Sequence, residues 1–324
     1  MKRKILIVRF SSIGDLILIT PIIRCVKKQL NGEIHLITKA AFKSVLINNP
    51  YIDKHWSFEK SVFECIDALK DENFDIVVDL QKNLRSLLLR TILRKNSYSF
   101  DKINFKKWLM CNLKLNFMPD KHLVDRYFDG VQRLKVINDG MGLDYFFKPN
   151  QDYKHCIEKL PDHFVAGVLG AAHRTKQIPF EKWREIIEAV ELPIVLIGGG
   201  AEISLGQELE KAFPGKFVNC AGQFSIDQSA AILANSRMVI TPDTGMMHIA
   251  AALRKPMHVV WGNTIPGFGM YPYFGNQPGN YRSHEVMNLK CRPCSKLGFR
   301  TCPKNHFKCM MQQEFSKELL ELEI

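Results

Sequence analysis

The residues best suited to chemistry lie in one short stretch, Asp243-Thr244-Gly245 followed by His248. An apolar run over residues 238–240 leads into this stretch, and a helix-like segment follows it. This pattern places the N–H groups of Thr244 and Gly245 at a helix N-terminus, where they would bind an anion. The acid Asp243 lies in the same loop, and its presence next to an anion site needs an explanation. His248 could join the anion site or pack in the core, since histidine serves both uses.

A second candidate group, Ser11, Ser12, Gly14 and Asp15, lies between the first apolar run and the first helix-like segment. The group holds a single glycine, so the G-x-G-x-x-G pattern of a dinucleotide site is absent. A serine at this point can cap the helix, and the helix dipole favours an acid in the first turn. These residues alone predict a helix start.

Two further charged residues, Lys176 and Glu202, follow strand-like runs in the second half of the chain. A lysine at a strand end can hold an anionic ligand, although most loop lysines are solvated surface charges. The three glycines before Ala201 allow the backbone to approach a ligand closely, and Glu202 could accept hydrogen bonds from a ribose. Each of these signals is weak when taken alone.

The elements that must position these residues are apolar runs that alternate with helix-like segments. The runs are typical of buried parallel strands and occupy residues 4–10, 34–38, 74–80, 163–170, 193–199, 216–222, 238–240 and 257–261. Two such series predict two doubly wound, Rossmann-like α/β domains. We place them at residues 1–155 and 156–324, with the last helix either staying in the second domain or returning to the first. Ligands are expected at the carboxyl ends of the strands, in the cleft between the domains.

Charge is distributed unevenly along the 324 residues. The net charge is +12, and residues 1–150 carry 26 basic against 16 acidic residues. Residues 82–114 hold nine basic residues and one acid, interleaved with leucines and Trp108. This basic region fits an anionic membrane or an acidic substrate, and it also fits a solvated helix face. No nucleic-acid motif accompanies the charge, so nucleic acid is not an expected partner.

Cysteine usage predicts a reducing compartment. The nine cysteines are scattered, apart from four near the end of the chain: Cys291, Cys294, Cys302 and Cys309. With His306, these four could hold a structural zinc ion, or they could form a reduced local cluster. The basic, then apolar, N-terminus resembles a signal peptide but lacks a cleavage site, and no apolar run is long enough to cross a bilayer. We therefore expect a cytoplasmic protein.

The ordered motifs "RFSSIGDLILITP", "TKQIPFEKW", "GGGAE" and "TPDTGMMHIAAALRKP" resemble those of glycosyltransferase family 9. The resemblance spans both halves of the chain. It implies the GT-B fold, with two Rossmann-like domains facing a central cleft. It also implies inverting transfer of heptose from ADP-heptose to the inner core of lipopolysaccharide, on an acceptor of the Kdo–lipid A type. The ADP-sugar is a substrate in this chemistry, and no cofactor or metal ion is required.

The resemblance also implies a role for each motif residue. Asp15 matches the proposed general base, with Ser11, Ser12 and Gly14 beside it on the acceptor side of the cleft. Lys176 matches a lysine at the donor phosphate, and Glu202 matches an acid at the donor ribose. Asp243, Thr244 and Gly245 match the donor loop, near His248. In this interpretation the amides face the diphosphate and the Asp243 carboxylate faces the sugar hydroxyls.

The basic region would then face the lipid acceptor at the inner leaflet, through Arg90, Arg94, Lys106 and Lys107. This places the protein at the periphery of the inner membrane, on its cytoplasmic side. One departure from the family pattern affects the identity of the sugar: Ala171 and Ala172 replace hydroxyl residues, and Ile178 replaces a tryptophan. The alternatives are a transferase or epimerase that uses another nucleotide-sugar, and a non-catalytic basic lipid-binding protein.

Overall fold

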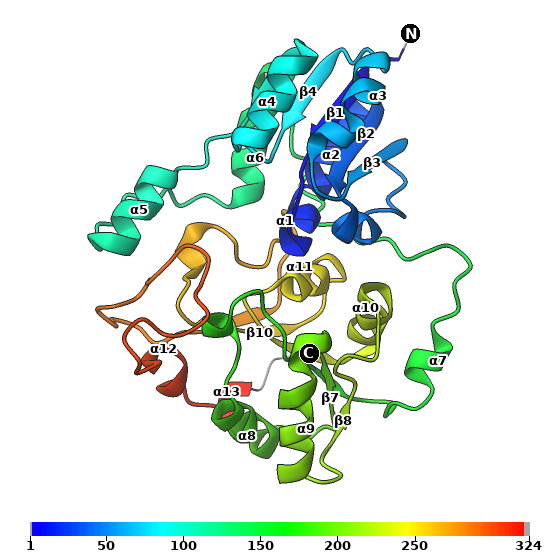
Figure 1. Cartoon of the computed structure of the whole chain (residues 1–324). Helices are drawn as coiled ribbons and strands as arrows, with labels where there is room; N and C mark the ends of the chain where they lie inside the picture. Colours follow the sequence, from blue (N-terminus) through cyan, green and yellow to red (C-terminus); the bar gives the residue numbers. More distant parts are fainter. Residues whose placement is uncertain (1, 321–324) are drawn as a thin grey trace. The chain divides into compact units, whose positions relative to one another are not determined.

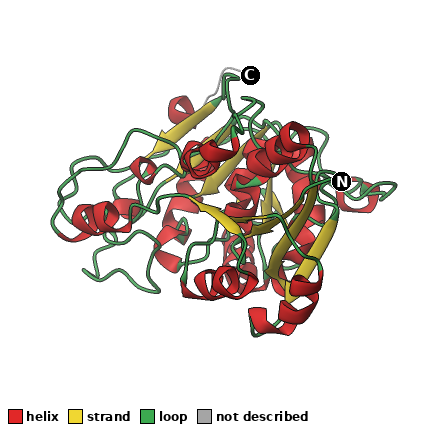
Figure 2. Ribbon diagram, turned by 90° about the horizontal axis from the view of Figure 1, so that it is seen from above, coloured by secondary structure: helices red, strands yellow, loops and turns green. Residues whose placement is uncertain are grey.

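Residues 2–320, which the computed structural model describes, form two compact units, each built on a parallel β-sheet (Figure 1). Unit 1 contains the chain up to Ile103, Lys121–Pro149 and Tyr273–Gln277. Unit 2 contains Asn104–Asp120, Asn150–Pro272 and the chain from Pro278 onward. Helices surround the strands (Figure 2).

The sheet of unit 1 has five parallel strands in the order β3-β2-β1-β4-β5. These strands are β1 Lys4–Val8, β2 Glu33–Lys39, β3 Lys54–Phe58, β4 Ile76–Asp79 and β5 Asn96–Ser99. The helices are α1 Ile13–Leu18, α2 Thr20–Leu30, α3 Ile66–Asp71, α4 Leu84–Leu93 and α6 Leu123–Val131, with 3₁₀ turns η1 Ala40–Val45, η2 Val62–Cys65 and η3 Gln132–Leu134. The central strands are almost wholly buried, as expected where helices cover both faces of a parallel sheet.

The sheet of unit 2 has six parallel strands in the order β11-β10-β9-β6-β7-β8. They are β6 Val165–Val168, β7 Ile194–Ile197, β8 Phe217–Asn219, β9 Met238–Pro242, β10 Met257–Val260 and β11 Tyr281–His284. The helices are α5 Asn104–Asn112, α7 Lys154–Ile157, α8 Phe180–Ala189, α9 Ile203–Ala212, α10 Ile226–Asn235, α11 Gly245–Ala252, α12 Lys308–Met311 and α13 Lys317–Leu320, with η4 Arg174–Lys176, η5 Gly200–Glu202 and η6 Pro266–Phe268.

Each sheet reverses its direction of growth at one point. In unit 1 the reversal lies between β1 and β4, and in unit 2 it lies between β6 and β9. Loops that leave the carboxyl ends of the two strands at such a point diverge to opposite faces of the sheet and leave a crevice for a ligand. The loop after β1 carries Asp15, the loop after β6 carries Lys176, and the loop after β9 carries Asp243. The topology thus assigns these three residues to the two reversal points.

The strands without a predicted counterpart, β3, β5 and β11, all lie at sheet edges. Their sequences, KHWSF, NSYS and YRSH, are polar, and most of their residues are partly or fully exposed. An edge strand has a neighbour on one side only and is less covered by helices, so it needs no continuous apolar run. The predicted runs instead correspond to the interior strands and to β8.

The two units do not divide at a single position in the chain. The predicted boundary at 155/156 lies close to Pro149/Asn150, where the chain passes from unit 1 to unit 2. Two segments depart from this division, because Asn104–Asp120 belongs to unit 2 and Tyr273–Gln277 belongs to unit 1. The Tyr273 hydroxyl donates to Asp125 (2.8 Å) and accepts from Asn138 (2.7 Å), which fixes this short segment to unit 1. Helix α13 belongs to unit 2, where Leu320 packs in the core. Its described residues therefore do not return to the first domain.

Candidate active site

The reversal point of unit 2 brings together two of the predicted donor residues. Lys176 Nζ lies 2.6 Å from Asp243 Oδ2, and both side chains are largely buried. The Thr264 hydroxyl, which follows β10, donates to the same oxygen at 2.8 Å. The acid of the donor loop therefore faces a lysine on the neighbouring strand-end loop. Within residues 2–320, Asp243 Oδ1 has no hydrogen-bond partner.

The helix that follows Asp243 offers amide donors. Thr244 is the N-cap of α11 in an extended conformation, its side chain makes no capping hydrogen bond, and Gly245 is the first helical residue. The first N–H groups of a helix have no carbonyl partner within the helix, so they are available to an anion. His248 lies one turn further on and is 2% exposed. This burial favours packing as its main role.

Glu202 lies at the end of η5, after β7, and is also buried. Its Oε2 accepts from the Gly199 N–H at 2.9 Å, and its Oε1 accepts from the Gln177 side chain at 3.0 Å. Burial raises the pKa of Glu202 above its ordinary value. The carboxylate links the β7 loop to the loop that carries Lys176. A carboxylate has further acceptor positions, so these two hydrogen bonds leave room for a ribose hydroxyl.

The reversal point of unit 1 contains Asp15, in the first turn of α1. Arg9 Nη2 lies 2.6 Å from Asp15 Oδ2. The Ser12 N–H and hydroxyl both donate to the same oxygen, at 3.2 and 3.1 Å. In the described part of the chain, the other oxygen, Oδ1, makes no hydrogen bond. Asp15 thus has one anchored oxygen and one that can accept a proton. Gly14 is buried and Ser11 is partly exposed beside it.

Arg9 is fixed by more than its acid. Its Nε donates to the Ser11 carbonyl at 2.9 Å, and its Nη1 donates to the Leu80 carbonyl and to the Tyr127 hydroxyl. Burial alone would raise the pKa of Asp15, but the Arg9 guanidinium and the Ser12 hydrogen bonds outweigh it and lower that pKa. Asp15 is therefore ionised at neutral pH and held in one orientation.

Residues 62–298 match the model of glycosyltransferase family 9 (heptosyltransferase), which is more than half of the chain. The chain belongs to glycosyltransferase family 9. This glycosyltransferase is 25% identical over 290 residues to lipopolysaccharide heptosyltransferase 1 of Campylobacter coli, across 81% of this chain and 84% of that protein.

Solved structures agree on the fold. A family 9 glycosyltransferase from Veillonella parvula superimposes with a TM-score of 0.73 at 18% identity, across 98% of this chain and 95% of that one. An Escherichia coli heptosyltransferase with ADP gives a TM-score of 0.63 at 21% identity, across 86% and 92%. With its two parallel α/β units, this family 9 enzyme has the predicted GT-B fold.

The predicted basic region is divided between the two units. Arg90 and Arg94 lie on α4 and at its C-terminus in unit 1, whereas Lys106 and Lys107 lie on α5 in unit 2. Arg90 Nε is 3.7 Å from the buried Asp79 carboxylate, so this residue supports the β4 end of its own sheet. Arg94 and Lys106 are exposed, and Lys107 Nζ lies 5.9 Å from the centre of the Phe268 ring. The sequence interval 82–114 therefore belongs to two different units.

The four late cysteines lie in unit 2 as free thiols. Cys291 Sγ is 3.7 Å from His306 Nε2, and four backbone N–H groups of residues 304–307 point at Cys302. Burial raises the pKa of Cys302, and these N–H groups more than reverse the effect, so that its pKa is lowered. Tetrahedral zinc needs its sulfur ligands about 4 Å apart. Within residues 2–320, no three of these Cys and His ligand atoms lie within 4.8 Å of one another. Zinc at this position stays a prediction.

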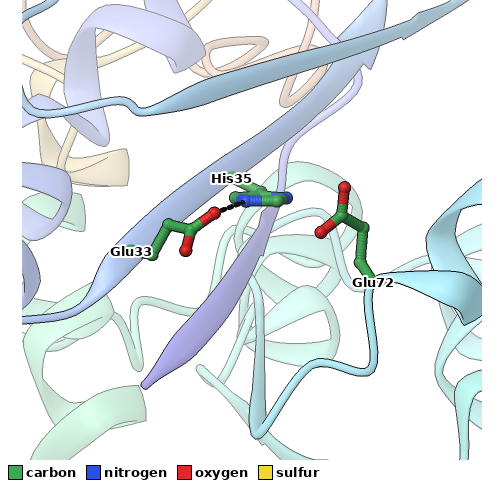
Figure 3. Close-up of side chains that lie close together, drawn as sticks. All are labelled: Glu33, His35 and Glu72. Carbon is green, nitrogen blue, oxygen red and sulfur yellow. Dashed lines mark hydrogen bonds and ion pairs between the residues drawn. The ribbon is translucent and has the colours of Figure 1, made fainter. Parts of the chain in front are cut away.

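One other group has metal-type ligands, Glu33, His35 and Glu72 (Figure 3). His35 Nε2 lies 2.8 Å from Glu33 Oε1. Glu72, however, is paired with Lys4 and Lys54, and hydrogen bonds from these two lysines lower its pKa to about 2. A metal ion would have to displace both ammonium groups. The Glu72 carboxylate is better described as an ion-pair partner that joins the end of α3 to β1 through Lys4 and to β3 through Lys54.

Two residues of these sites escaped the sequence analysis. Arg9 carried a usable signal, because a charged residue at the end of an otherwise apolar run must find a partner when the run is buried. Thr264 carried none, since nothing in "WGNTIPG" separates a hydroxyl that supports Asp243 from an ordinary loop threonine.

Proposed function

We propose that this family 9 glycosyltransferase moves heptose from ADP-heptose to the inner core of lipopolysaccharide, with inversion at the anomeric carbon. The observation that carries the proposal is the pair of half-anchored carboxylates, Asp15 and Asp243, each at a sheet reversal point and each beside a cation. The names of the matching relatives and the ADP in a matching structure support the choice of sugar and nucleotide.

The donor would bind to unit 2. The Thr244 and Gly245 N–H groups would donate to the diphosphate, and Glu202 would accept from the ribose. Lys176 would turn from Asp243 to the diphosphate, because a doubly charged ligand attracts an ammonium group more strongly than one carboxylate does. Asp243 would then accept hydrogen bonds from the sugar hydroxyls through Oδ1 and through the acceptor position on Oδ2 that Lys176 leaves, while Thr264 keeps its hydrogen bond to Oδ2.

The reaction is a single displacement. An acceptor hydroxyl gives its proton to Asp15 Oδ1 as its oxygen forms a bond to the anomeric carbon, and the bond from that carbon to the diphosphate breaks on the opposite face. ADP leaves with the bonding electrons. Base catalysis of this kind contributes about 10²–10⁴-fold, and Lys176 with the α11 amides stabilises the charge that develops on ADP. No step uses a metal ion.

The acceptor is a lipid, so the enzyme must work at a membrane surface. Among residues 2–320, no helix is both long and apolar enough to cross a bilayer. We propose peripheral attachment at the cytoplasmic side of the inner membrane, through the exposed Arg94 and Lys106 and the half-buried Lys107. Arg90 is left out of the proposed contact residues because its side chain is only 25% exposed and its Nε faces the buried Asp79 carboxylate at 3.7 Å.

Two measurements test this function. Purified enzyme should hydrolyse or transfer from ADP-heptose in preference to UDP- and GDP-sugars, and mass spectrometry should show that lipopolysaccharide cores lose heptose in cells without the protein. Preference for another nucleotide-sugar would overturn the assignment of ADP-heptose as the donor but would leave the assignment as a glycosyltransferase in place. An intact core in the deletion strain would overturn the assigned acceptor.

A further inference from the structure

Helix α5 has no buried residue, although five large apolar side chains lie on it and on the loop after it. They are Phe105, Trp108, Leu113, Leu115 and Phe117, and each is 47–70% exposed. The Phe105 and Trp108 rings stack on each other with their centres 6.3 Å apart. A folded protein rarely leaves so much apolar area together in water without a partner for it.

A second segment, distant in sequence, lies against this one. Lys114 Nζ donates to the carbonyls of Cys291 (3.2 Å) and Pro293 (2.7 Å), and Lys296 Nζ donates to the Asn104 side chain (3.2 Å). The second segment also exposes large apolar side chains, those of Met287, Leu297 and Phe299. Residues 104–119 and 286–313 are both in unit 2, and we call them together the basic–apolar surface.

The charge of this surface has one sign. Residues 104–119 hold three lysines and no acid, and residues 286–313 hold six basic residues and no acid. Arg292 is neutralised by Glu285 at 2.6 Å, but Lys106, Lys290, Lys296, Arg300, Lys304 and Lys308 are exposed. The second half of the chain has nearly equal numbers of basic and acidic residues, but its acidic residues lie outside residues 286–313. A count over the whole half therefore does not reveal this basic segment.

We propose that the basic–apolar surface docks unit 2 onto an anionic lipid bilayer, with Phe105 and Trp108 entering the interface. Lysines attract anionic headgroups, and aromatic rings favour the boundary between headgroups and acyl chains. Nucleic acid fits less well, since the exposed Leu113, Leu115, Met287 and Leu297 offer nothing to phosphates or bases. The proposal rests on the proposed function for the need to meet a membrane, and it adds the surface that does so.

The test is sedimentation of the full-length protein with vesicles of phosphatidylglycerol and phosphatidylcholine, against vesicles of phosphatidylcholine alone, at low and high salt. Wild-type protein should bind the anionic vesicles and be released by salt. Phe105→Ser/Trp108→Ser should weaken binding roughly tenfold or more. Lys290→Glu/Lys304→Glu should weaken it by at least about tenfold, although these lysines lie far from α5 in sequence.

Matched controls use another part of unit 2. Lys211→Glu/Lys216→Glu makes the same charge change on exposed residues that make no ion pair within residues 2–320, and Leu192→Ser removes one exposed apolar side chain. Both should bind vesicles like wild type. Trp108 also gives a direct signal, because Trp183 and Trp261 are fully buried and the remaining tryptophan, the half-buried Trp56, belongs to unit 1. Brominated lipids should quench the wild-type fluorescence and quench Trp108→Phe much less.

Several outcomes would overturn the proposal. They are absence of wild-type binding at low salt, equal losses in the control variants, no effect of Lys290→Glu/Lys304→Glu, or tight binding of an oligonucleotide in place of vesicles. Transfer to a delipidated soluble acceptor should persist in the Phe105→Ser/Trp108→Ser variant. Wild-type protein that transfers the sugar but binds no vesicles would overturn this surface alone, and wild-type protein that binds vesicles but transfers no sugar would overturn the proposed reaction alone.

Discussion

The two reversal points present the same arrangement with different cations. Asp15 faces Arg9 and Asp243 faces Lys176, both at 2.6 Å, and in each case one carboxylate oxygen takes all the contacts. Arg9 is also bonded to Ser11, Leu80 and Tyr127, whereas Asp243 is the only partner of the Lys176 ammonium within residues 2–320. Arginine forms a rigid fork, and lysine is a mobile point charge. One acid is thus held permanently, and the other holds a cation that can leave.

The largest expected effect is that of a substitution in the Arg9–Asp15 pair. Asp15→Asn keeps the size and the Ser12 hydrogen bonds of the side chain but cannot accept a proton, so turnover should fall by about two to four decades. ADP affinity should not change, because the nucleotide binds to the other unit. Steady-state kinetics with calorimetry of ADP measures both. Near-normal turnover would leave Asp15 as a helix-terminus residue only.

Substitutions at the two residues of the Lys176–Asp243 pair should change ADP affinity in different ways. Lys176→Ala should weaken ADP binding roughly 10- to 150-fold, the equivalent of about 1.5–3 kcal/mol for a charge-assisted hydrogen bond. Asp243→Asn should leave ADP affinity equal or tighter, because the competitor for the ammonium is gone, while turnover with the sugar donor falls. Calorimetry with ADP alone distinguishes the two. If both variants lose ADP affinity equally, the pair acts as a fixed unit and the contrast with Arg9 disappears.

The smallest effect concerns pH. The pKa of Asp15 is lowered by Arg9 against the effect of burial, so Arg9→Lys, with fewer hydrogen bonds, should raise that pKa. The acidic limb of kcat/KM should move to higher pH. The stability contributed by ionised Asp15 is present above the unfolded pKa of about 3.9 and is lost as pH falls through the lower folded pKa, so acid resistance should also decline.

The control for the pH measurement is Arg9→Lys made together with Asp15→Asn. The residual activity of this double variant should show no acidic limb from this group. An unchanged limb in Arg9→Lys alone would show that Arg9 does not set the protonation of Asp15.

Much of this arrangement is predictable from sequence because it depends on local patterns. Continuous apolar runs predicted the interior strands, and the loops after β1, β6 and β9 carry the residues that the motifs singled out. The edge strands β3, β5 and β11 were missed, because a half-covered strand needs no apolar run. The partner of Asp243 could not be predicted, since the neighbourhood of Lys176 and Asp243 depends on strand order and not on their spacing.

The basic region shows a limit of counting charge along a sequence. Residues 82–114 are continuous in sequence and uniformly basic, but the chain passes from unit 1 to unit 2 between Ile103 and Asn104. The last third of the interval therefore belongs to the same unit as residues 286–313. Charge can be counted along a sequence, whereas a surface is assembled from segments that folding brings together.

The short Tyr273–Gln277 segment also bears on how such enzymes can be recombined. A gene cut near residue 150 would yield a first fragment without Tyr273 and the backbone that packs against Gly140 and Gly142. It would also carry Asn104–Asp120 away from the unit to which that segment belongs. A chimera that joins the halves of two relatives must therefore exchange discontinuous pieces of gene. Simple fusion at one junction would leave both halves incomplete.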